Sequence, residues 1–392
     1  MKDLNVRLHS LAIFRNLLKD PVIAALCDFL QQTQEVSAVS AYAQFVAELY
    51  RMEKRTLAGH IQSIVGRDEN AYIRLIGRGE TPWPEMEATV MAELQVLQEV
   101  ADLTPEIFHR AIKWKGHLPG FGVKRVDLVA FYRERCRDIS KFGYGIYAKY
   151  HMFYVNQSNK IVPVRNPDRT RLESLVDYER EQKIIMDNTI ALLEGRPAAN
   201  ILLTGDAGTG KSSTVKAVVN ELYQRGLRIL EVRKEQLHDI AWILDELSVN
   251  PLKFILFIDD LSFQKDDDNF SALKAVLEGS VSAKSSNVVI YATSNRRHLV
   301  KETFSSREGD DVHRNDTIQE VISLSERFGI RVTFQKPNKK TYIDIVHHLA
   351  RERGLDIDPV RLEMEAEQYA LGRGGRSARA ASQFIDSLMA AK

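Results

Sequence analysis

The stretch ILLTGDAGTGKSSTVKAVV, residues 201–219, decides how the rest of the chain is interpreted. An apolar run of strand length ends at Gly205, a glycine-rich loop follows, and a good helix-forming sequence begins at Lys211. Gly205, Gly210, Lys211 and Ser212 satisfy the pattern G-x-x-x-x-G-K-[ST], which a chain of this length matches by accident about 1% of the time. The segment is therefore predicted to be a phosphate-binding loop between a strand and a helix.

Such a loop binds phosphate by electrostatics. Its glycines let successive backbone N–H groups turn toward phosphate oxygens, and the following helix adds the positive end of its dipole. Lys211 is expected to reach the β- and γ-phosphates of ATP, and Ser212 is expected to ligate Mg²⁺. The predicted nucleotide-binding residues are Gly205, Asp206, Ala207, Gly208, Thr209, Gly210, Lys211, Ser212 and Ser213.

A second acidic site follows about 45 residues later. The apolar stretch FILFIDDLSF, residues 254–263, contains the pair Asp259 and Asp260. Beside a phosphate loop, such a pair resembles a Walker B motif: Asp259 is expected to hold Mg²⁺ through water, and Asp260 to polarise the attacking water. Many such enzymes carry glutamate at the second place, and aspartate is one methylene shorter. This difference keeps a slow-turnover protein open as an alternative.

The spacing of apolar runs predicts the fold class. Runs of strand length lie at 201–203, 229–232, 254–258, 288–292 and 330–334, with helical stretches between them. Five such runs predict an α/β domain with a five-stranded parallel sheet that is covered on both faces. After Pro337 only helices are expected, at about 339–353, 358–370 and 377–391.

Four parts are predicted along the chain. Residues 1–140 read as a mainly helical N-terminal domain, because apolar residues recur there at helical spacing. Residues 141–175 read as a short hairpin and linker, with the polar stretch RNPDRTRLES as the boundary. Residues 176–337 form the predicted ATP-binding domain, and residues 338–392 a helical lid.

Composition excludes several classes of protein. The chain has 392 residues and a formal net charge of +1, so it has no global field that would attract nucleic acid or membrane. Its two cysteines, Cys27 and Cys136, match no metal or redox spacing and are expected to be reduced thiols. With no signal peptide and no run of about 18 apolar residues, a cytoplasmic protein is predicted, with no membrane partner.

Three further motifs resemble elements of the AAA+ ATPases. The strand VVIYATSN ends at Asn295, where those proteins carry the sensor 1 residue, although an asparagine there could also cap a helix. In SLSERFG, Arg327 matches the arginine finger, with a local ion pair as the alternative. The segment GGRSARAASQF is similar to sensor 2, and its spacing favours Arg379 with Arg376 as a close competitor.

Upstream of the loop, LVDYEREQKIIMDNTIALLEGRPAANILLTG is similar to the segment that holds adenine in AAA+ proteins. Val176 and Tyr178 are the candidates there. From about residue 141 onward the chain closely resembles one bacterial AAA+ family of uncharacterised ATPases, the domain-of-unknown-function family eight-fifteen. The markers are KYHMFYV, VPVRNPD, FIDDLSF, ATSNRRHLV, SSREGDDVHRND and SLSERFG. The acidic loop around Asp310, Asp311 and His313 matches no metal pattern.

The resemblance implies ATP and Mg²⁺ as ligands and a homo-oligomer, ring or filament, because an arginine finger acts on the neighbouring subunit's ATP. It names no substrate. Residues 108–154 are rich in Lys and Arg with interleaved aromatics, so nucleic acid is a candidate partner. The competing interpretation places those aromatics in a core and those charges in water.

Two functions of different classes follow. The first is ATP hydrolysis in an oligomer, coupled to remodelling or loading of a macromolecule. The alternative is a slow-turnover ATP-dependent switch or scaffold that signals through the helical N-terminal domain. A small-molecule kinase is disfavoured, because Asn295 and Arg327 would have no role in it.

Overall fold

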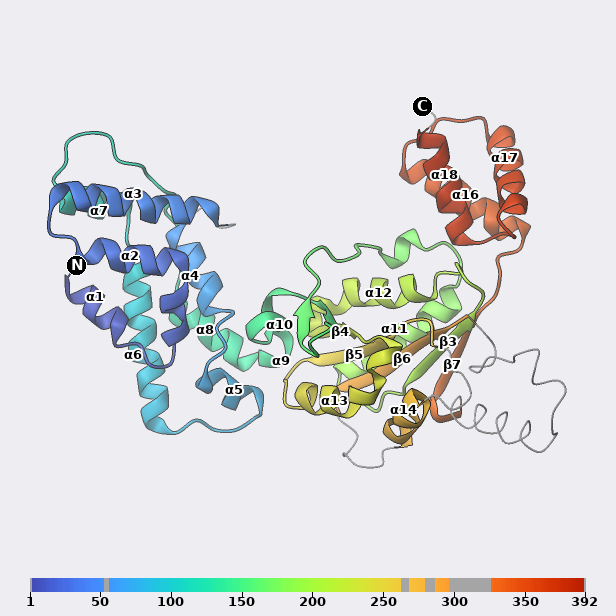
Figure 1. The fold of residues 1–392 in the computed structure, drawn as a ribbon, viewed down its shortest axis with the longest axis horizontal. Coiled ribbons are helices and arrows are strands. Elements are labelled where there is room, and N and C mark those ends of the chain that lie inside the picture. Colours follow the sequence, from blue (N-terminus) through green and yellow to red (C-terminus); the bar gives the residue numbers. More distant parts are fainter. Residues whose placement is uncertain (1, 53–55, 262–267, 279–285, 296–325, 391–392) are drawn as a thin grey trace. The chain divides into compact units, whose positions relative to one another are not determined.

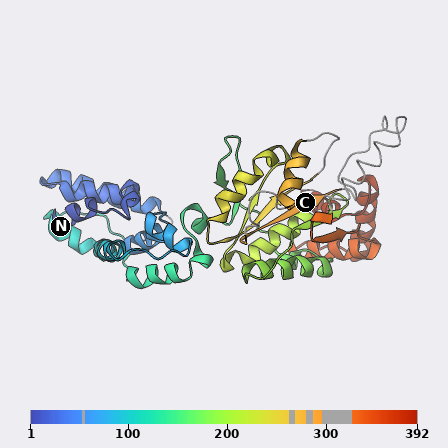
Figure 2. The same ribbon diagram turned by 90° about the horizontal axis from the view of Figure 1, so that it is seen from below.

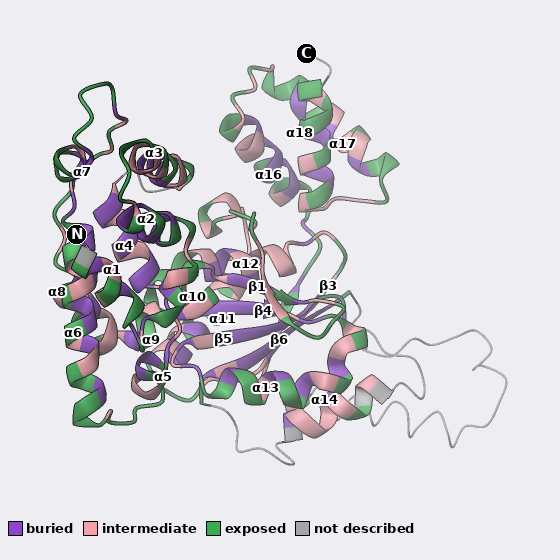
Figure 3. Cartoon of the chain, turned by 60° about the vertical axis from the view of Figure 1, so that its left-hand side comes forward, coloured by how far each residue is buried: buried purple, intermediate pink, exposed green. Residues whose placement is uncertain are grey.

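The computed structural model describes residues 2–52, 56–261, 268–278, 286–295 and 326–390. The chain divides into two compact units, Met1–Lys149 and Tyr150–Lys392. Figures 1 and 2 show the helices of the first unit, and the layered sheet and C-terminal helices of the second. Each unit has its own apolar core, which Figure 3 shows in purple.

The first unit is built of helices around one core. The helices are α1 (Lys2–His9), α2 (Pro21–Gln31), α3 (Glu35–Arg51), α4 (Leu57–Val65), α5 (Ala71–Gly77), α6 (Pro84–Ala101), α7 (Pro105–Ile112), α8 (Leu128–Arg137), α9 (Ile139–Phe142) and α10 (Gly145–Lys149), with a 3₁₀ turn at Arg15–Lys19. Side chains of Asp20, Thr56 and Asn70 cap the starts of α2, α4 and α5. A chain of 15 residues joins α7 to α8, from Lys113 to Asp127.

The second unit contains one mainly parallel sheet. Its strands are β1 (Met152–Val155), β2 (Ile161–Pro163), β3 (Ile201–Gly205), β4 (Leu227–Glu231), β5 (Lys253–Ile258), β6 (Val288–Ser294) and β7 (Ile330–Phe334), in the order β2-β1-β4-β5-β6-β3-β7. The α/β fold and the parallel sheet predicted from the apolar runs are therefore confirmed.

The predicted number of five strands is wrong. The hairpin expected at 141–175 is not separate from the sheet: β1 pairs in parallel with β4, with Phe153 opposite Leu230, and β2 returns antiparallel to β1. Without β1, the outer edge of β4 would present unpaired N–H and C=O groups. The short β2 then forms the new edge and ends at Pro163, a residue that sheets tolerate only there.

Helices cover both faces of the sheet, as Figures 1 and 2 show together. On one face lie α11 (Glu179–Leu193) and α12 (Lys211–Leu222), and on the other α13 (Ile240–Ser248) and α14 (Asp268–Glu278). Residues 254–258 of β5 are all buried, as expected for a strand with two covered faces. Because the strands other than β2 are parallel, their C-terminal ends lie at the same end of the sheet, where the phosphate loop begins.

The three C-terminal helices pack on one another. They are α16 (Lys339–Glu352), α17 (Pro359–Gly372) and α18 (Ala378–Ala390), and they share a cluster that includes Tyr342, Val346, Ala366 and Phe384. Asn338 caps α16 and Asp358 caps α17. Among the described helices of both units, none combines the length and the apolar character needed to cross a membrane. The four-part division at residues 140, 175 and 337 stays a prediction.

Candidate functional site

The loop between β3 and α12 is shaped by glycines. Gly205, Gly208 and Gly210 have φ values of 146°, 79° and 90°, which other residues rarely adopt. At Gly205 a Cβ atom would stand 2.1 Å from the carbonyl oxygen of Phe334, so this position has room for glycine alone. The backbone of the loop is therefore free to turn its N–H groups inward, as phosphate binding requires.

Lys211 lies buried beneath this loop. Its ammonium donates to the carbonyl oxygens of Gly205 and Asp206, both at 2.8 Å, and to Oδ1 of Asn295 at 2.9 Å. The three N–H donors of the ammonium thus have three acceptors. Lys211 is 5% exposed, and burial lowers its pKa below the usual value of a lysine. The charge is held where phosphate oxygens would reach it.

Asp259 and Ser212 meet at the end of β5. The Ser212 hydroxyl donates to Oδ1 of Asp259 at 2.6 Å, and the buried Thr293 hydroxyl donates to the same oxygen at 2.6 Å. Hydroxyl and carboxylate oxygens are the ligands that Mg²⁺ prefers, and Mg²⁺ bound this way keeps several waters. The pair Ser212 and Asp259 therefore fits the predicted metal. Across the described residues, no cluster of three or more His, Cys, Asp or Glu forms a competing metal site.

Asp260 is tied to the lysine through Asn295. The Asn295 amide donates to Oδ1 of Asp260 at 2.7 Å, while its carbonyl oxygen accepts from Lys211. The Asp260 backbone N–H donates to Thr293 Oγ1 at 2.9 Å, and Asp260 has φ of 54°. A non-glycine residue in that conformation carries about 1–3 kcal/mol of strain, so its side-chain direction is held by the site.

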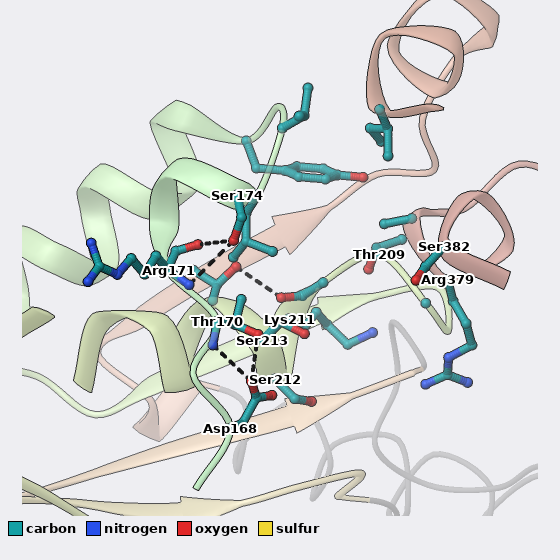
Figure 4. Close-up of a pocket in the computed structure, with 18 of the residues that line it drawn as sticks. Asp168, Thr170, Arg171, Ser174, Thr209, Lys211, Ser212, Ser213, Arg379 and Ser382 are labelled. Carbon is teal, nitrogen blue, oxygen red and sulfur yellow. Dashed lines mark hydrogen bonds between the residues drawn. The ribbon is translucent and has the colours of Figure 1, made fainter. Parts of the chain in front are cut away.

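The C-terminal helices contribute Arg379 to the same pocket. The Arg379 backbone N–H lies 3.4 Å from the carbonyl oxygen of Gly208, and its side chain stands beside the phosphate loop (Figure 4). Arg376 instead forms a two-pronged ion pair with Glu367, at 2.8 and 2.6 Å, and does not line the pocket. Geometry thus favours Arg379 over Arg376 as the residue available to a nucleotide.

Val176 and Tyr178 lie at the apolar end of the pocket. Val176 packs against the cluster of the C-terminal helices, and Ile345 and Leu349 of α16 line the same end. Tyr178 has φ of 69°, its ring packs against Phe334 with centroids 5.0 Å apart and planes tilted by 44°, and its hydroxyl donates to the carbonyl oxygen of Gln335 at 2.5 Å. An apolar slot of this kind suits a planar base. The whole pocket measures about 1090 Å³, large enough for a nucleotide.

Several pocket residues were not predicted from the sequence. Segment 168–175, interpreted as a polar linker, runs along the pocket, and Asn220 of α12 holds it by bonds to the carbonyls of Asp168 and Thr170 at 2.9 and 2.8 Å. Figure 4 shows the Arg171 side chain pointing away from Lys211, so the segment contributes backbone more than charge. Thr293 was also missed, although it lies near the end of β6, two residues before Asn295, which directly follows that strand.

Arg327 is not brought to this pocket. It precedes β7 by three residues, and the first residue of β7, Ile330, pairs with Ile201 at the start of β3. The phosphate loop starts at the other end of β3, four residues or about 13 Å further along the strand. Arg327 therefore lies toward the opposite edge of the sheet from the loop of its own chain. The loop containing Asp310, Asp311 and His313 lies outside the described residues.

Comparison with solved structures gives distant likenesses. The Thermotoga maritima RuvB Holliday junction branch migration motor is 18% identical over 55% of this chain and 63% of its own, with a TM-score of 0.39. A chain of the Escherichia coli MS115-1 HORMA:CdnC:Trip13 complex is 13% identical over 56% of this chain and 92% of its own, with a TM-score of 0.38. The chain thus spans less than two thirds of the RuvB structure.

No curated protein matches the chain. The protein resembles the AAA+ ATPases in the motifs that the pocket assembles, namely the phosphate loop, the acidic pair and Asn295. One family matches residues 148–392, well over half of the length. The chain therefore belongs to the family described as "Protein of unknown function (DUF815)".

Proposed function

We propose that this protein is an ATPase of the AAA+ type that binds ATP with Mg²⁺ and hydrolyses it in an oligomer. The single observation that carries the proposal is the hydrogen-bonded chain from Lys211 through Asn295 to Asp260. A site that only binds phosphate would need the charge of Lys211 but no carboxylate connected to it. Here Asn295 connects Lys211 to the carboxylate of Asp260, next to the metal-binding pair Ser212 and Asp259. This arrangement can position and activate a water molecule for attack on the γ-phosphate.

The role of each residue follows from its position. Bound ATP with Mg²⁺ supplies the phosphoanhydride bond to be cleaved. Lys211 neutralises the terminal phosphates, and Ser212 with Asp259 holds the metal. Asp260 accepts a hydrogen bond from the attacking water, with Asn295 fixing the direction of its carboxylate. Arg379 adds positive charge from the C-terminal helices, which then act as a lid over the nucleotide.

An oligomer is proposed from the place of Arg327. An arginine that stabilises charge on the γ-phosphate must touch it, and Arg327 lies toward the opposite edge of the sheet from its own loop. A neighbouring subunit can present its Arg327 where its own chain cannot. We further propose that the lid transmits the state of the nucleotide between subunits, and so remodels or loads a macromolecule.

A mixing experiment tests the shared site. Lys211→Ala has a defective loop and an intact finger, and Arg327→Ala has the reverse. Each variant alone should show at most about 1% of wild-type ATP turnover, while an equimolar mixture should recover a measurable share, because some interfaces pair an intact loop with an intact finger. Arg331→Ala, an exposed arginine on β7, serves as the control and should keep its turnover. Full activity of Arg327→Ala would sink the trans assignment.

The switch remains a second candidate because of Asp260. Its carboxylate is shorter than a glutamate, and one of its oxygens is already bonded to Asn295. Both features favour slow turnover with tight binding. A steady-state rate on the order of 1 s⁻¹ in the oligomer excludes the switch, and a rate near background with saturating ATP supports it.

A further inference from the structure

The loop that joins α7 to α8 concentrates positive charge. Between Ile107 and Val126 the sequence carries Arg110, Lys113, Lys115, Lys124 and Arg125, with no Asp or Glu. The basic loop, defined as residues 113–125, holds four of them, and all four are exposed. Within the described chain none of these four forms an ion pair with an acidic side chain, so their charge is available to a partner.

An exposed aromatic ring stands among these charges. Trp114 is 46% exposed, and its ring lies directly against the backbone of Gly116. A Cβ atom at Gly116 would stand 2.3 Å from the indole, so any side chain there would push the ring away. The Trp114 ring thus occupies the space that a side chain at position 116 would need, and Trp114 stands between Lys113 and Lys115 in the sequence.

The middle of the basic loop is anchored to the helical core. The Tyr42 hydroxyl donates to the carbonyl oxygen of Pro119 at 2.7 Å, and the Tyr50 hydroxyl donates to that of Gly120. Thr56 pairs with Gly122 as a short parallel bridge, and Leu118 is buried. A fixed centre limits the ordering entropy that binding would otherwise cost, so the basic ends on either side of it are partly preorganised.

The structure also shows which part of residues 108–154, the region predicted from sequence as a candidate for nucleic-acid binding, has exposed aromatic rings. Of the aromatics between residues 108 and 154, Phe108, Tyr132 and Tyr144 are buried in the core. They cannot stack on a partner, as the competing interpretation expected. Tyr154 is also exposed, at 41%, but it lies in strand β1 of the second unit, whereas Trp114 shares its loop with four cations that form no ion pair within the described chain.

We propose that the basic loop is a binding surface for single-stranded nucleic acid, with the four cations on the phosphates and Trp114 stacked on a base. This chemistry matches a polyanion with an accessible aromatic face. An acidic peptide would use the charge and leave the ring without a partner. A membrane surface would require more apolar area than Trp114 and Val123 expose.

Fluorescence anisotropy of a labelled 20-nucleotide oligothymidylate with the full chain tests the proposal. We expect Lys113→Glu with Lys115→Glu, and Lys124→Glu with Arg125→Glu, each to weaken binding at least ten-fold. Trp114→Ala should weaken it roughly ten-fold. The logarithm of the binding constant should fall against the logarithm of salt with a slope of about −3 for four phosphate contacts, and less steeply in the charge variants.

Matched controls separate this surface from general effects. Lys19→Glu changes an exposed lysine of the same unit, and Trp83→Ala removes another exposed tryptophan, 53% exposed, so both should bind like the wild type. Gly116→Ala keeps every charge and the indole but displaces the ring, so it should resemble Trp114→Ala. Thermal melting confirms that each variant is folded, and Gly116→Ala replaces Trp114→Ala if the latter is not.

Four results would overturn the proposal. The first is wild-type affinity no higher than that of the variant with all four charges reversed. The second is equal binding by the wild type, Trp114→Ala and Gly116→Ala, which would mean that charge alone acts. The third is displacement of the oligonucleotide by vesicles of phosphatidylserine at equal charge. The fourth is equal binding of a duplex of the same length.

Discussion

The two ends of the proposed nucleotide pocket are built in different ways. At the phosphate end, Lys211, Asp259, Asp260, Thr293 and Asn295 are joined by hydrogen bonds of 2.6 to 2.9 Å. At the base end, Val176 and two residues of α16 offer apolar contact. The first end is formed by the C-terminal ends of strands and the start of α12, whereas the second forms only where the C-terminal helices pack against the segment before α11.

The two ends therefore differ in the kind and the size of the interaction energy that they offer a ligand. Hydrogen bonds to charged groups are directional and each carry about 1.5–3 kcal/mol, while an apolar contact contributes about 0.8 kcal/mol per buried methylene. Substitutions at the phosphate end should therefore cause large and specific losses. Substitutions at the base end should cause small losses that depend on the base being present.

The largest loss is expected from Lys211→Ala. Removing the ammonium leaves the triphosphate charge without its closest compensation and three acceptors without their donor, so ATP affinity should fall at least 100-fold. Isothermal titration measures it. Lys216→Ala is the control, because Lys216 lies on the same helix and faces Glu231 at 3.8 Å, and it should bind normally. Equal losses of ATP affinity in both variants would show that Lys211 has no special role in binding the phosphates.

Thr293→Val is expected to affect turnover more than binding. The change keeps the shape of the side chain but removes the hydroxyl that Asp259 accepts from and that receives the Asp260 N–H. Losing a buried partner of this kind costs about 1–3 kcal/mol, so turnover should fall roughly 10- to 100-fold with ATP affinity within about three-fold of wild type. Thr293→Ser, which retains the hydroxyl, should recover most of the rate. A Thr293→Val enzyme with normal turnover would show that the carboxylates need no such support.

The two lid arginines should differ. Arg379→Ala removes a charge that lines the pocket and should weaken ATP binding about ten-fold. Arg376→Ala breaks the ion pair with Glu367 and should lower the melting temperature while leaving ATP affinity unchanged. The reverse pattern, with affinity lost in Arg376→Ala alone, would transfer the sensor 2 role to Arg376.

The smallest effect belongs to the base end. Val176→Ala removes two methyl groups from the apolar slot, and because Val176 is only half-buried the loss should stay at about 1 kcal/mol, which weakens ATP binding about five-fold. Inorganic tripolyphosphate, which has no base, should bind the variant and the wild type alike. Val164→Ala, a partly buried valine outside the pocket, is the matched control. Should tripolyphosphate lose as much affinity as ATP, Val176 would be supporting the phosphate loop and not a base.

The sequence predicted that the phosphate-end residues lie together because their motifs are local, while their roles toward a nucleotide stay predictions. Gly205 to Ser212 form a contiguous motif, and Asp259 and Asn295 each directly follow an apolar strand, so parallel strands bring them together. The prediction of five strands was wrong because strand pairing depends on distant parts of the chain. Whether β1 joins β4 or stands apart depends on pairing partners more than 70 residues away, which alternation in a short segment does not specify.

The unpredicted pocket residues share that property. Segment 168–175 lines the pocket because Asn220 and Glu221, some 50 residues later, bind its backbone. Composition could identify only a polar stretch with a proline. Ile345 and Leu349 likewise read as ordinary core positions of an amphipathic helix, and only the packing of α16 shows that they also border a ligand site.

The close approach of Gly205 to Phe334 has a mechanical consequence. The strand β7 ends against the phosphate loop, with Gly205 opposite Phe334, and the chain then leaves for α16 through Gln335, whose carbonyl oxygen Tyr178 holds. The chain that leads into α16 is thus held at two neighbouring residues, Phe334 and Gln335. In the lid movement that we propose, residues 336–338 are therefore the expected hinge, and a small shift of the phosphate loop beside it would move the far ends of the C-terminal helices further.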